Sequence, residues 1–511
     1  MAKSQLWSKI SLWLMLWMFS AALLMVASWD SYLHDIYLHY ETPWFFMCGK
    51  AWMNGLTPYV DFADSKGPLL WLIYGLGYLI SPRDYTGIYW ISTLFFTIAF
   101  YYAYKSALLI TGNRATAALA TAIMAFLMLV KWIHDETRCE DFCCAAIMPV
   151  VYFFIKCNKA TSSNGSLVKK SAFTLGISLG VTLMIKYNFT AMVAVSIPYF
   201  AWIMPRRLNY SPWRALKWIA IGSAAVMAPI ICVLAVQGCF LDFLREYFLV
   251  TAKTINNLQT EGTVGQRISF VLGSHLVQIY LLLINVLVIV AVWKVRSWRW
   301  PLVVAFVWCV IIIALNLKNP FYLQPLSLFA MPGVALTVKP LNRILSRWQW
   351  KITAVAAVMA LLMWGSNKGT FFNLPETAKQ RVFYYFAALQ AQYDKPKIIY
   401  LNCFDLGSSV PVDALPGCKY WAMQAGATSE MIEQNRQAVL HGNADVVIVE
   451  TNDRSGRNLL DSIGYHCYSS RGAGVEHFDH TLYSRQPLDT IKAAAFHITP
   501  RDIVCKRRLF P

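Results

Sequence analysis

Acidic and basic side chains gather beside aromatic residues in the first long polar stretch of the chain. The segment 58–71 reads PYVDFADSKGPLLW, so Asp61, Asp64 and Lys66 stand directly before a Gly-Pro pair and an apolar run. Glu41 precedes this segment and is followed closely by an aromatic run. Charged groups beside an apolar run are costly, which makes them functional candidates. A carboxylate among them could deprotonate an acceptor hydroxyl.

Three later segments, HDETRCEDF, MIKYN and NPFYLQP, carry further polar candidates for substrate binding. These candidates are Arg138, Glu140, Asp141, Lys186, Tyr322 and Gln324. Of these, Arg138 and Lys186 could meet a phosphate. Acids from separate loops on one membrane face suit general-base chemistry, because one can take a proton while others orient the reactants.

Simpler interpretations of these residues stay open at this point. Acids in loops outside the cytoplasm are an ordinary complement of basic loops inside it, and most of them are solvated. This applies to Asp30, Asp35, Asp135 and Glu136. Asp64 and Lys66 could form only a weak local ion pair. Lys186 could simply extend its amine to the membrane interface.

The composition predicts a mainly α, polytopic membrane helix bundle. The 511 residues are 57% hydrophobic and 14% charged, and the mean hydropathy is +0.44. Soluble domains carry about 25% charged residues. Many apolar runs approach the ~20 residues needed to cross a membrane, and about eleven such helices are predicted. We place them near 8–28, 86–104, 115–132, 142–156, 171–186, 188–204, 216–237, 270–293, 300–316, 321–338 and 351–365.

The distribution of charge predicts the topology. The net charge of +18 does not indicate nucleic acid binding, because the basic residues are spread over short loops. With the N-terminus inside the cytoplasm, the basic clusters fall inside and most loop acids outside, provided that 67–80 does not cross the membrane. That run is short and contains Gly75 and Gly77, so we expect a half-inserted helix. The outer loops then span about 29–85 and 133–141.

The chain changes character after the last predicted span. We therefore divide it into a transmembrane domain, 1–365, and a small α/β domain, 366–511, outside the cytoplasm. The runs 397–403 and 444–450 predict buried strands, and 429–440 predicts an amphipathic helix. Cysteines at 403, 418, 467 and 505 allow one or two disulfides without fixing a pairing. The cysteines at 139, 143 and 144 lack a second pair at ligand spacing, so no metal cluster is predicted there.

The order of these motifs resembles the GT-C superfamily of bacterial integral-membrane glycosyltransferases. The relevant branch is glycosyltransferase family 39, similar to the protein O-mannosyltransferases and related to the aminoarabinose lipid A transferase. The matching residues are Glu41, the aromatic run 44–46, Gly49, Gly55, the string PYxDxxDxKGP over 58–68, the acidic helix start TRCEDF over 137–142, and KYN at 186–188. The resemblance covers the N-terminal half well and the tail in outline.

The resemblance implies a GT-C fold and transfer of a sugar from a polyprenyl-phosphate donor, most simply with inversion. The family's catalytic acid corresponds to Glu41, with Asp35 as the alternative. The acceptor would be a lipid, a glycan or a protein of the cell envelope. The donor phosphate would lie near Lys186, Lys66 or Arg138, and these basic side chains would stabilise it as it leaves. A divalent metal is therefore compatible with this chemistry but not required. The resemblance places the chain in the cytoplasmic (inner) membrane, among membrane lipids, with the C-terminal domain in the periplasm. A flippase or transporter of lipid-linked glycans, or a glycan polymerase, is the alternative.

Overall fold

The structure is a computed structural model in which the chain forms two compact units. The first comprises Met1–Trp29, Trp90–Cys232 and Gly262–Thr370, and the second comprises Asp30–Tyr89, Val233–Glu261 and Phe371–Pro511. The described residues are 2–31, 41–130, 133–160, 163–259, 265, 275–294, 299–314, 320–346, 392–405, 407, 410, 412–423, 426–450, 452–469 and 480–488.

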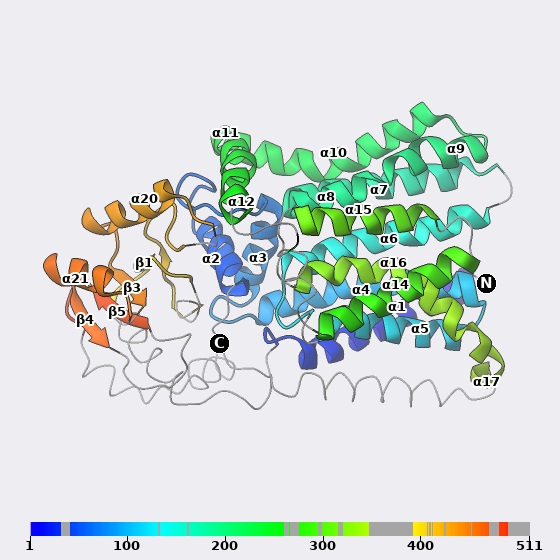
Figure 1. Cartoon of the computed structure of the whole chain (residues 1–511), viewed down its shortest axis with the longest axis horizontal. Helices are drawn as coiled ribbons and strands as arrows, with labels where there is room; N and C mark the ends of the chain where they lie inside the picture. The colour runs from blue at the N-terminus through cyan, green and yellow to red at the C-terminus, as the bar shows by residue number, and fades with distance from the viewer. Residues whose placement is uncertain are drawn as a thin grey trace. The chain divides into compact units, whose positions relative to one another are not determined.

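The first unit is a bundle of long apolar helices that lie side by side (Figure 1). Its elements are α1 (Ala2–Ala27), α4 (Thr86–Thr111), α5 (Arg114–Leu129), α6 (Cys139–Lys159), α7 (Gly165–Ile185), α8 (Tyr187–Ala194), η1 (Tyr199–Ile203), α9 (Met204–Arg207), α10 (Pro212–Val236), α14 (His275–Lys294), α15 (Arg299–Ala314), η4 (Pro320–Leu323), α16 (Gln324–Val338), η5 (Lys339–Leu341) and α17 (Asn342–Ser346). Among the described residues, 6 helical stretches are long and apolar enough to cross a membrane.

The predicted spans agree with these helices. Every predicted span from 8–28 to 321–338 overlaps a described helix or helical series. The predicted helix 188–204 is divided into α8, η1 and α9, and a π-helical turn lies in its middle. The predicted span 351–365 and the domain boundary at 365 lie outside the described residues. The sidedness of the loops stays a prediction.

Two helices of the second unit come from the first predicted outer loop. They are α2 (Thr42–Met53) and α3 (Pro68–Ile80). With 13 residues, α3 is about 20 Å long, well short of a hydrocarbon core of about 30 Å. The two helices pack closely because Gly49 lacks a side chain: a Cβ there would lie 2.4 Å from the backbone nitrogen of Gly75. A second segment of this unit contains α11 (Phe240–Leu244), η2 (Arg245–Val250) and α12 (Thr251–Gln259).

The C-terminal part of the second unit is a small α/β fold. Its strands β1 (Lys397–Leu401), β2 (Leu415–Pro416), β3 (Val446–Glu450), β4 (His466–Ser469) and β5 (His480–Ser484) form a sheet of order β2-β1-β3-β5-β4. β1 pairs in parallel with β2 and β3, and β5 pairs antiparallel with β3 and β4. The helix α20 (Ser429–Leu440) lies between β2 and β3 in the chain, within the long crossover that parallel neighbours such as β1 and β3 require. The helix α21 (Arg454–Ser462) follows β3.

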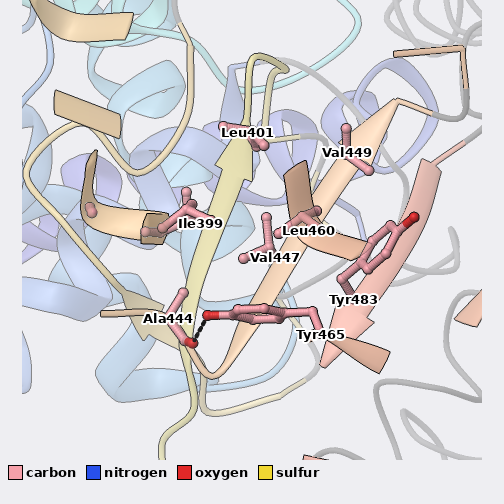
Figure 2. Packing of buried hydrophobic residues seen from close by; sticks show 10 residues of the cluster. Ile399, Leu401, Ala444, Val447, Val449, Leu460, Tyr465 and Tyr483 are labelled. Atoms are coloured by element: carbon pink, nitrogen blue, oxygen red, sulfur yellow. Dashed lines mark hydrogen bonds between the residues drawn. The ribbon is translucent and has the colours of Figure 1, made fainter. Parts of the chain in front are cut away.

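Alternate residues of the central strands build the core of this fold. Side chains two positions apart on a strand share a face, so Ile399 and Leu401 of β1 meet Val447 and Val449 of β3 (Figure 2). The hydroxyl of Tyr465 donates a hydrogen bond of 2.8 Å to the carbonyl of Ala444 beneath this cluster. The predicted strands 397–403 and 444–450 and the predicted helix 429–440 are confirmed.

The described cysteines are all free thiols. In the C-terminal fold Cys403 is buried, Cys418 is partly buried and Cys467 is exposed. The disulfides that the sequence allowed are therefore absent among these three, and Cys505 lies outside the described residues.

Candidate functional site

Glu41 stands at the start of a buried helix. It is the N-cap of α2, whose following residues are almost all buried, and its Oε2 atom is itself buried. Beside it, the hydroxyl of Thr42 donates to Asp30 Oδ2 over 3.4 Å. Asp30 is only 4% exposed, so the interpretation of this residue as a solvated loop acid is wrong. The sequence feature that could have predicted its burial is its position just after the apolar first helix. Asp35 lies outside the described residues.

The motif that opens at Pro58 is a tight, self-bonded loop. Asp61 Oδ2 accepts from the backbone N–H of Thr57 over 2.7 Å, so this exposed acid holds the turn. Tyr59 has a φ of 64°, an uncommon conformation for a bulky residue, which indicates local strain. Its buried hydroxyl donates to the carbonyl of Lys66 over 3.1 Å. The loop therefore presents its last charged residues from a fixed backbone.

Asp64 and Lys66 lie at the end of this loop. The Lys66 Nζ is 4.0 Å from Asp64 Oδ1, too long for a strong ion pair, and donates to Ser65 Oγ over 3.0 Å. It also lies 5.4 Å from the ring centre of Phe45, one helical turn after Glu41. Asp64 is buried, and its Oδ2 has no hydrogen-bond partner among the described residues. The second unit therefore places Lys66 beside Phe45, which follows the predicted base by one helical turn.

Two tryptophan side chains of the same unit also bury a polar atom that has no hydrogen-bond partner among the described residues. The indole N–H groups of Trp44 and Trp71 are buried without a hydrogen-bond partner in the described part of the chain. Trp71 packs against the loop, with its ring centre 4.5 Å from that of Tyr59. An unpaired buried polar group costs about 1–3 kcal/mol and calls for an explanation. A polar ligand bound beside α2 and α3 would supply partners for these atoms.

The C-terminal fold supports α2 from within the same unit. The buried amine of Lys50, in the last turn of α2, donates to the carbonyl of Val412. Burial lowers the pKa of Lys50 to about 7, although Asp413 and Asp405 oppose this change. The ring of Trp44 packs on Trp421 with centres 4.9 Å apart.

A second junction joins the loop and the α11–α12 segment to the C-terminal fold. The backbone N–H of Ala63 donates to the carbonyl of Lys419 over 3.0 Å. Glu246 is buried and accepts from Lys419 Nζ over 2.7 Å and from the hydroxyl of Tyr420 over 2.8 Å. The predicted tail domain therefore packs against the candidate catalytic helix and its loop.

In the first unit, Asp141 is the centre of a buried hydrogen-bond network. Its Oδ1 lies 3.2 Å from His134 Nδ1 and accepts from Gln324 Nε2 over 2.7 Å, while its Oδ2 accepts from the backbone N–H of Arg138 over 2.9 Å. Gln324 also donates to the carbonyl of Met128 over 3.1 Å. Asp141 thereby ties the start of α6 to the start of α16 and the end of α5. Burial alone would lower the pKa of His134, but Asp141 outweighs it and the pKa is raised.

The neighbouring acid, Glu140, has a different partner. Its Oε1 accepts from Lys186 Nζ over 2.7 Å, and both side chains are buried. The same amine lies 4.2 Å from the ring centre of Tyr322, which places this aromatic residue over the cation. The thiol of Cys139 donates to Glu140 Oε2 over 2.9 Å. Lys186 is therefore held at a fixed point after α7, and it does more than extend to the interface.

Arg138 is also paired with acids. Its Nη2 lies 2.7 Å from Asp135 and 3.0 Å from Glu136, and its guanidinium stacks 4.4 Å from the ring centre of Phe321. Glu136 is 0% exposed, so its interpretation as a solvated acid is wrong as well. The six candidates of the later segments thus lie in one buried cluster of the first unit, and Glu41, Asp61, Asp64 and Lys66 belong to the second.

Comparison with known proteins identifies the fold. No family model and no curated protein matches the chain. Among solved structures, the chain is similar to ArnT from Cupriavidus metallidurans in the apo state, with a TM-score of 0.60 and 11% identity over 94% of this chain and 98% of that one. It is also similar to the same protein bound to undecaprenyl phosphate, with a TM-score of 0.57 and 12% identity over 95% and 98%. ArnT is the aminoarabinose lipid A transferase, to which the sequence motifs are related, and the chain shares the fold of ArnT over nearly its whole length.

Proposed function

We propose that the chain is a membrane glycosyltransferase that moves a sugar from a polyprenyl-phosphate donor to an acceptor hydroxyl of the cell envelope. The observation that carries this proposal is the similarity of nearly the whole chain to ArnT, including the structure of ArnT bound to undecaprenyl phosphate. The similarity extends over both units, so it includes the C-terminal fold. We propose that the chain works in the cytoplasmic membrane on its outer side.

Glu41 is proposed as the general base. It would take the proton from the acceptor hydroxyl while that oxygen attacks the anomeric carbon of the donor sugar. The bond between the anomeric carbon and the phosphate oxygen breaks, and its electron pair leaves with polyprenyl phosphate. A single displacement of this kind inverts the anomeric centre. Two features support Glu41: its Oε2 is buried at the start of α2, and α2 is fixed by packing on α3 and on the C-terminal fold.

Lys66 is proposed as the main ligand of the donor phosphate. It is supported by the position of its amine, which is presented by the self-bonded loop and lies 5.4 Å from the ring centre of Phe45, one helical turn after Glu41. Lys186 is hydrogen bonded to Glu140, and Arg138 lies between two carboxylates. We propose that these two cations organise the buried cluster. A lysine at the leaving phosphate stabilises the charge that develops there, so the step does not require a divalent metal.

Asp64 is proposed to hold the sugar. Its Oδ2 has no hydrogen-bond partner in the described part of the chain and can accept from sugar hydroxyls, which supports this role. Asp61 is proposed to act through the loop backbone, because it caps the turn at Thr57. Asp30, which lies at hydrogen-bond distance from Thr42, is proposed as a positioning residue for the start of α2.

The test is transfer in reconstituted vesicles. The full chain is incorporated with a polyprenyl-phosphate sugar labelled in the sugar, and both the released polyprenyl phosphate and the sugar bound to the acceptor are measured. A general base contributes about 10²–10⁴-fold, so Glu41→Gln should reduce transfer by that factor. Glu433→Gln, on the exposed face of α20, is the matched control and should leave transfer unchanged. Transfer should persist in EDTA.

The outcomes separate the function from the residue assignment. Movement of labelled lipid across the vesicle without cleavage would exclude the transferase and support a flippase. Growth of the labelled glycan into long chains would instead support a polymerase. If wild-type protein transfers the sugar and Glu41→Gln is equally active, the function holds but the assignment of the base is wrong.

A further inference from the structure

A cluster of basic side chains occupies one end of the first unit, where α6 and α9 end and α7 and α10 begin. We name it the basic patch, and its members are Lys156, Lys159, Lys169, Lys170, Arg206, Arg207, Arg214 and Lys217, all exposed. Hydrogen bonds join these helix ends: Asn158 Oδ1 accepts from Arg207 Nη1 over 3.2 Å and from the hydroxyl of Tyr199 over 2.8 Å. Gly165, at the start of α7, packs against the ring of Tyr210, two residues before α10.

The basic patch forms no ion pair with an acid in the part of the chain that the structure describes. The sequence contains no aspartate or glutamate from residue 142 to residue 241, which includes all of α7, α8 and α9. None of the patch members takes part in the ion pairs found among the described residues. Within the described residues, each of these cations therefore keeps a charge that an external anion can neutralise.

Helix dipoles raise the positive potential further. The N-terminal end of a helix carries a partial positive charge, so cations there are unfavourable. Lys169 and Lys170 nevertheless lie near the start of α7, and Arg214 lies in the first turn of α10. In contrast, the charges on α6 are favourable for its helix dipole, because acids lie in its first turn and lysines in its last. The unfavourable arrangement on α7 and α10 would be relieved by an anion bound between their starts.

Aromatic residues of the patch indicate where that anion is located. Trp213 is 72% exposed, and its ring lies edge-on to that of Trp202, with centres 5.7 Å apart. Arg206 stacks over Trp202 at 5.0 Å, and Lys169 stacks over Trp218 at 3.9 Å. Tryptophan beside lysine and arginine is the combination typical of the headgroup level of a membrane. Farther along α10, exposed apolar residues such as Ile221 offer a surface for acyl chains.

We propose that the basic patch is a binding site for an anionic phospholipid, whose phosphate lies between the starts of α7 and α10. Its acyl chains would lie along the apolar surface of α10, and Trp213 would pack at the level of the glycerol backbone. This lipid is neither donor nor acceptor of a sugar, so the proposal is independent of the glycosyltransferase function. Basic pockets between membrane helices bind such headgroups in general.

The experiment measures lipid binding to the purified full chain by native mass spectrometry. Phosphatidylglycerol is titrated against phosphatidylcholine with the same acyl chains, in low salt and in high salt. A basic residue at an anionic surface strengthens binding about fivefold. The double variant Lys169→Gln with Arg214→Gln should therefore bind phosphatidylglycerol about 25-fold more weakly. Binding of phosphatidylcholine should not change.

Two further variants keep this test decisive. Lys397→Gln with Arg436→Gln removes the same charge from exposed positions of the C-terminal fold and should bind like wild type. Trp213→Ala changes no charge and should still weaken phosphatidylglycerol binding severalfold. The proposal is overturned if the two lipids bind equally, if the control weakens binding as much as the patch variant does, or if inorganic phosphate displaces the lipid at equal concentration.

Discussion

Replacement of Gly49 by alanine tests whether the contact between α2 and α3 positions Glu41. A Cβ at residue 49 would lie 2.4 Å from Gly75 N, 2.7 Å from Tyr74 C and 2.9 Å from Trp71 O. All three are backbone atoms, which cannot rotate away, and carbon contacts are comfortable only from about 3.5 Å. The two helices must therefore separate by about 1 Å, and overpacking of this kind typically costs about 1–3 kcal/mol.

The separation would move the base as well as weaken the fold. Glu41 is the N-cap of the same helix, so a shift of α2 relative to α3 displaces its carboxylate from Lys66 and the loop. A misplacement of about 1 Å can reduce a rate about 100-fold. We expect Gly49→Ala to lower kcat by about that factor, with a smaller change in KM for the donor. The assay is the vesicle transfer reaction, normalised to folded protein by the thermal unfolding midpoint of each variant.

Gly75→Ala provides the matched control on the facing helix. Its Cβ would meet mainly the flexible end of Met53, at 2.8 and 3.0 Å, and the carbonyl of Gly49 at 3.2 Å. Rotation of the methionine relieves most of this contact, so kcat should remain within about threefold of wild type. A folded Gly49→Ala protein with wild-type kcat would refute the argument that this contact positions Glu41. Equal losses in both variants would refute the steric reasoning that distinguishes them.

The remaining predictions concern three charged groups. Lys66→Met should raise KM for the donor and lower kcat, each about tenfold or more, because a charge-assisted contact to the phosphate is lost, and Lys66→Arg should restore part of both. Because burial lowers the pKa of Lys50 to about 7 from 10.5, the unfolded chain binds more protons between these values. The thermal unfolding midpoint of wild type, taken relative to that of Lys50→Met, should therefore rise from pH 7 to pH 9. The raised pKa of His134 has the opposite sign: its stabilisation is complete below pH 6.5 and is lost as the pH rises through the folded-state pKa. Asp141→Asn should abolish that loss, and an unchanged pH profile would contradict the assignment of the pair.

The helices and strands could be predicted because each depends on a local pattern. Apolar runs of membrane length predict α4, α7 and α10, and two short apolar runs predict the central strands β1 and β3. Even the short helix α3 followed from a local property, its length of 13 residues. The end of α5 and the start of α6 differ from the prediction by several residues, because polar residues that the sequence places in a loop belong to the first turn of α6.

The supports of the candidate site could not be predicted, because their partners are distant in sequence. The hydrogen bond from Lys50 joins residues 362 positions apart, and the bond from Gln324 to Asp141 joins residues 183 apart. No local pattern distinguishes these side chains from solvated ones. For the same reason Asp30 and Glu136 were expected to be solvated, whereas both side chains are buried in the structure.

Glu140 and Asp141 show most clearly what a linear motif conceals. As neighbouring acids in the first turn of α6, they appear equivalent in the sequence, and both are typical of a helix start. Successive side chains on a helix point about 100° apart, so the two acids reach different neighbours. Asp141 turns to Gln324 and His134 and fixes three helix ends, whereas Glu140 turns to Lys186 and holds a cation. Substitution of Asp141 should therefore affect stability first, and substitution of Glu140 should leave Lys186 buried without its acid. A motif match assigns both residues to the site, but their different partners imply different roles within it.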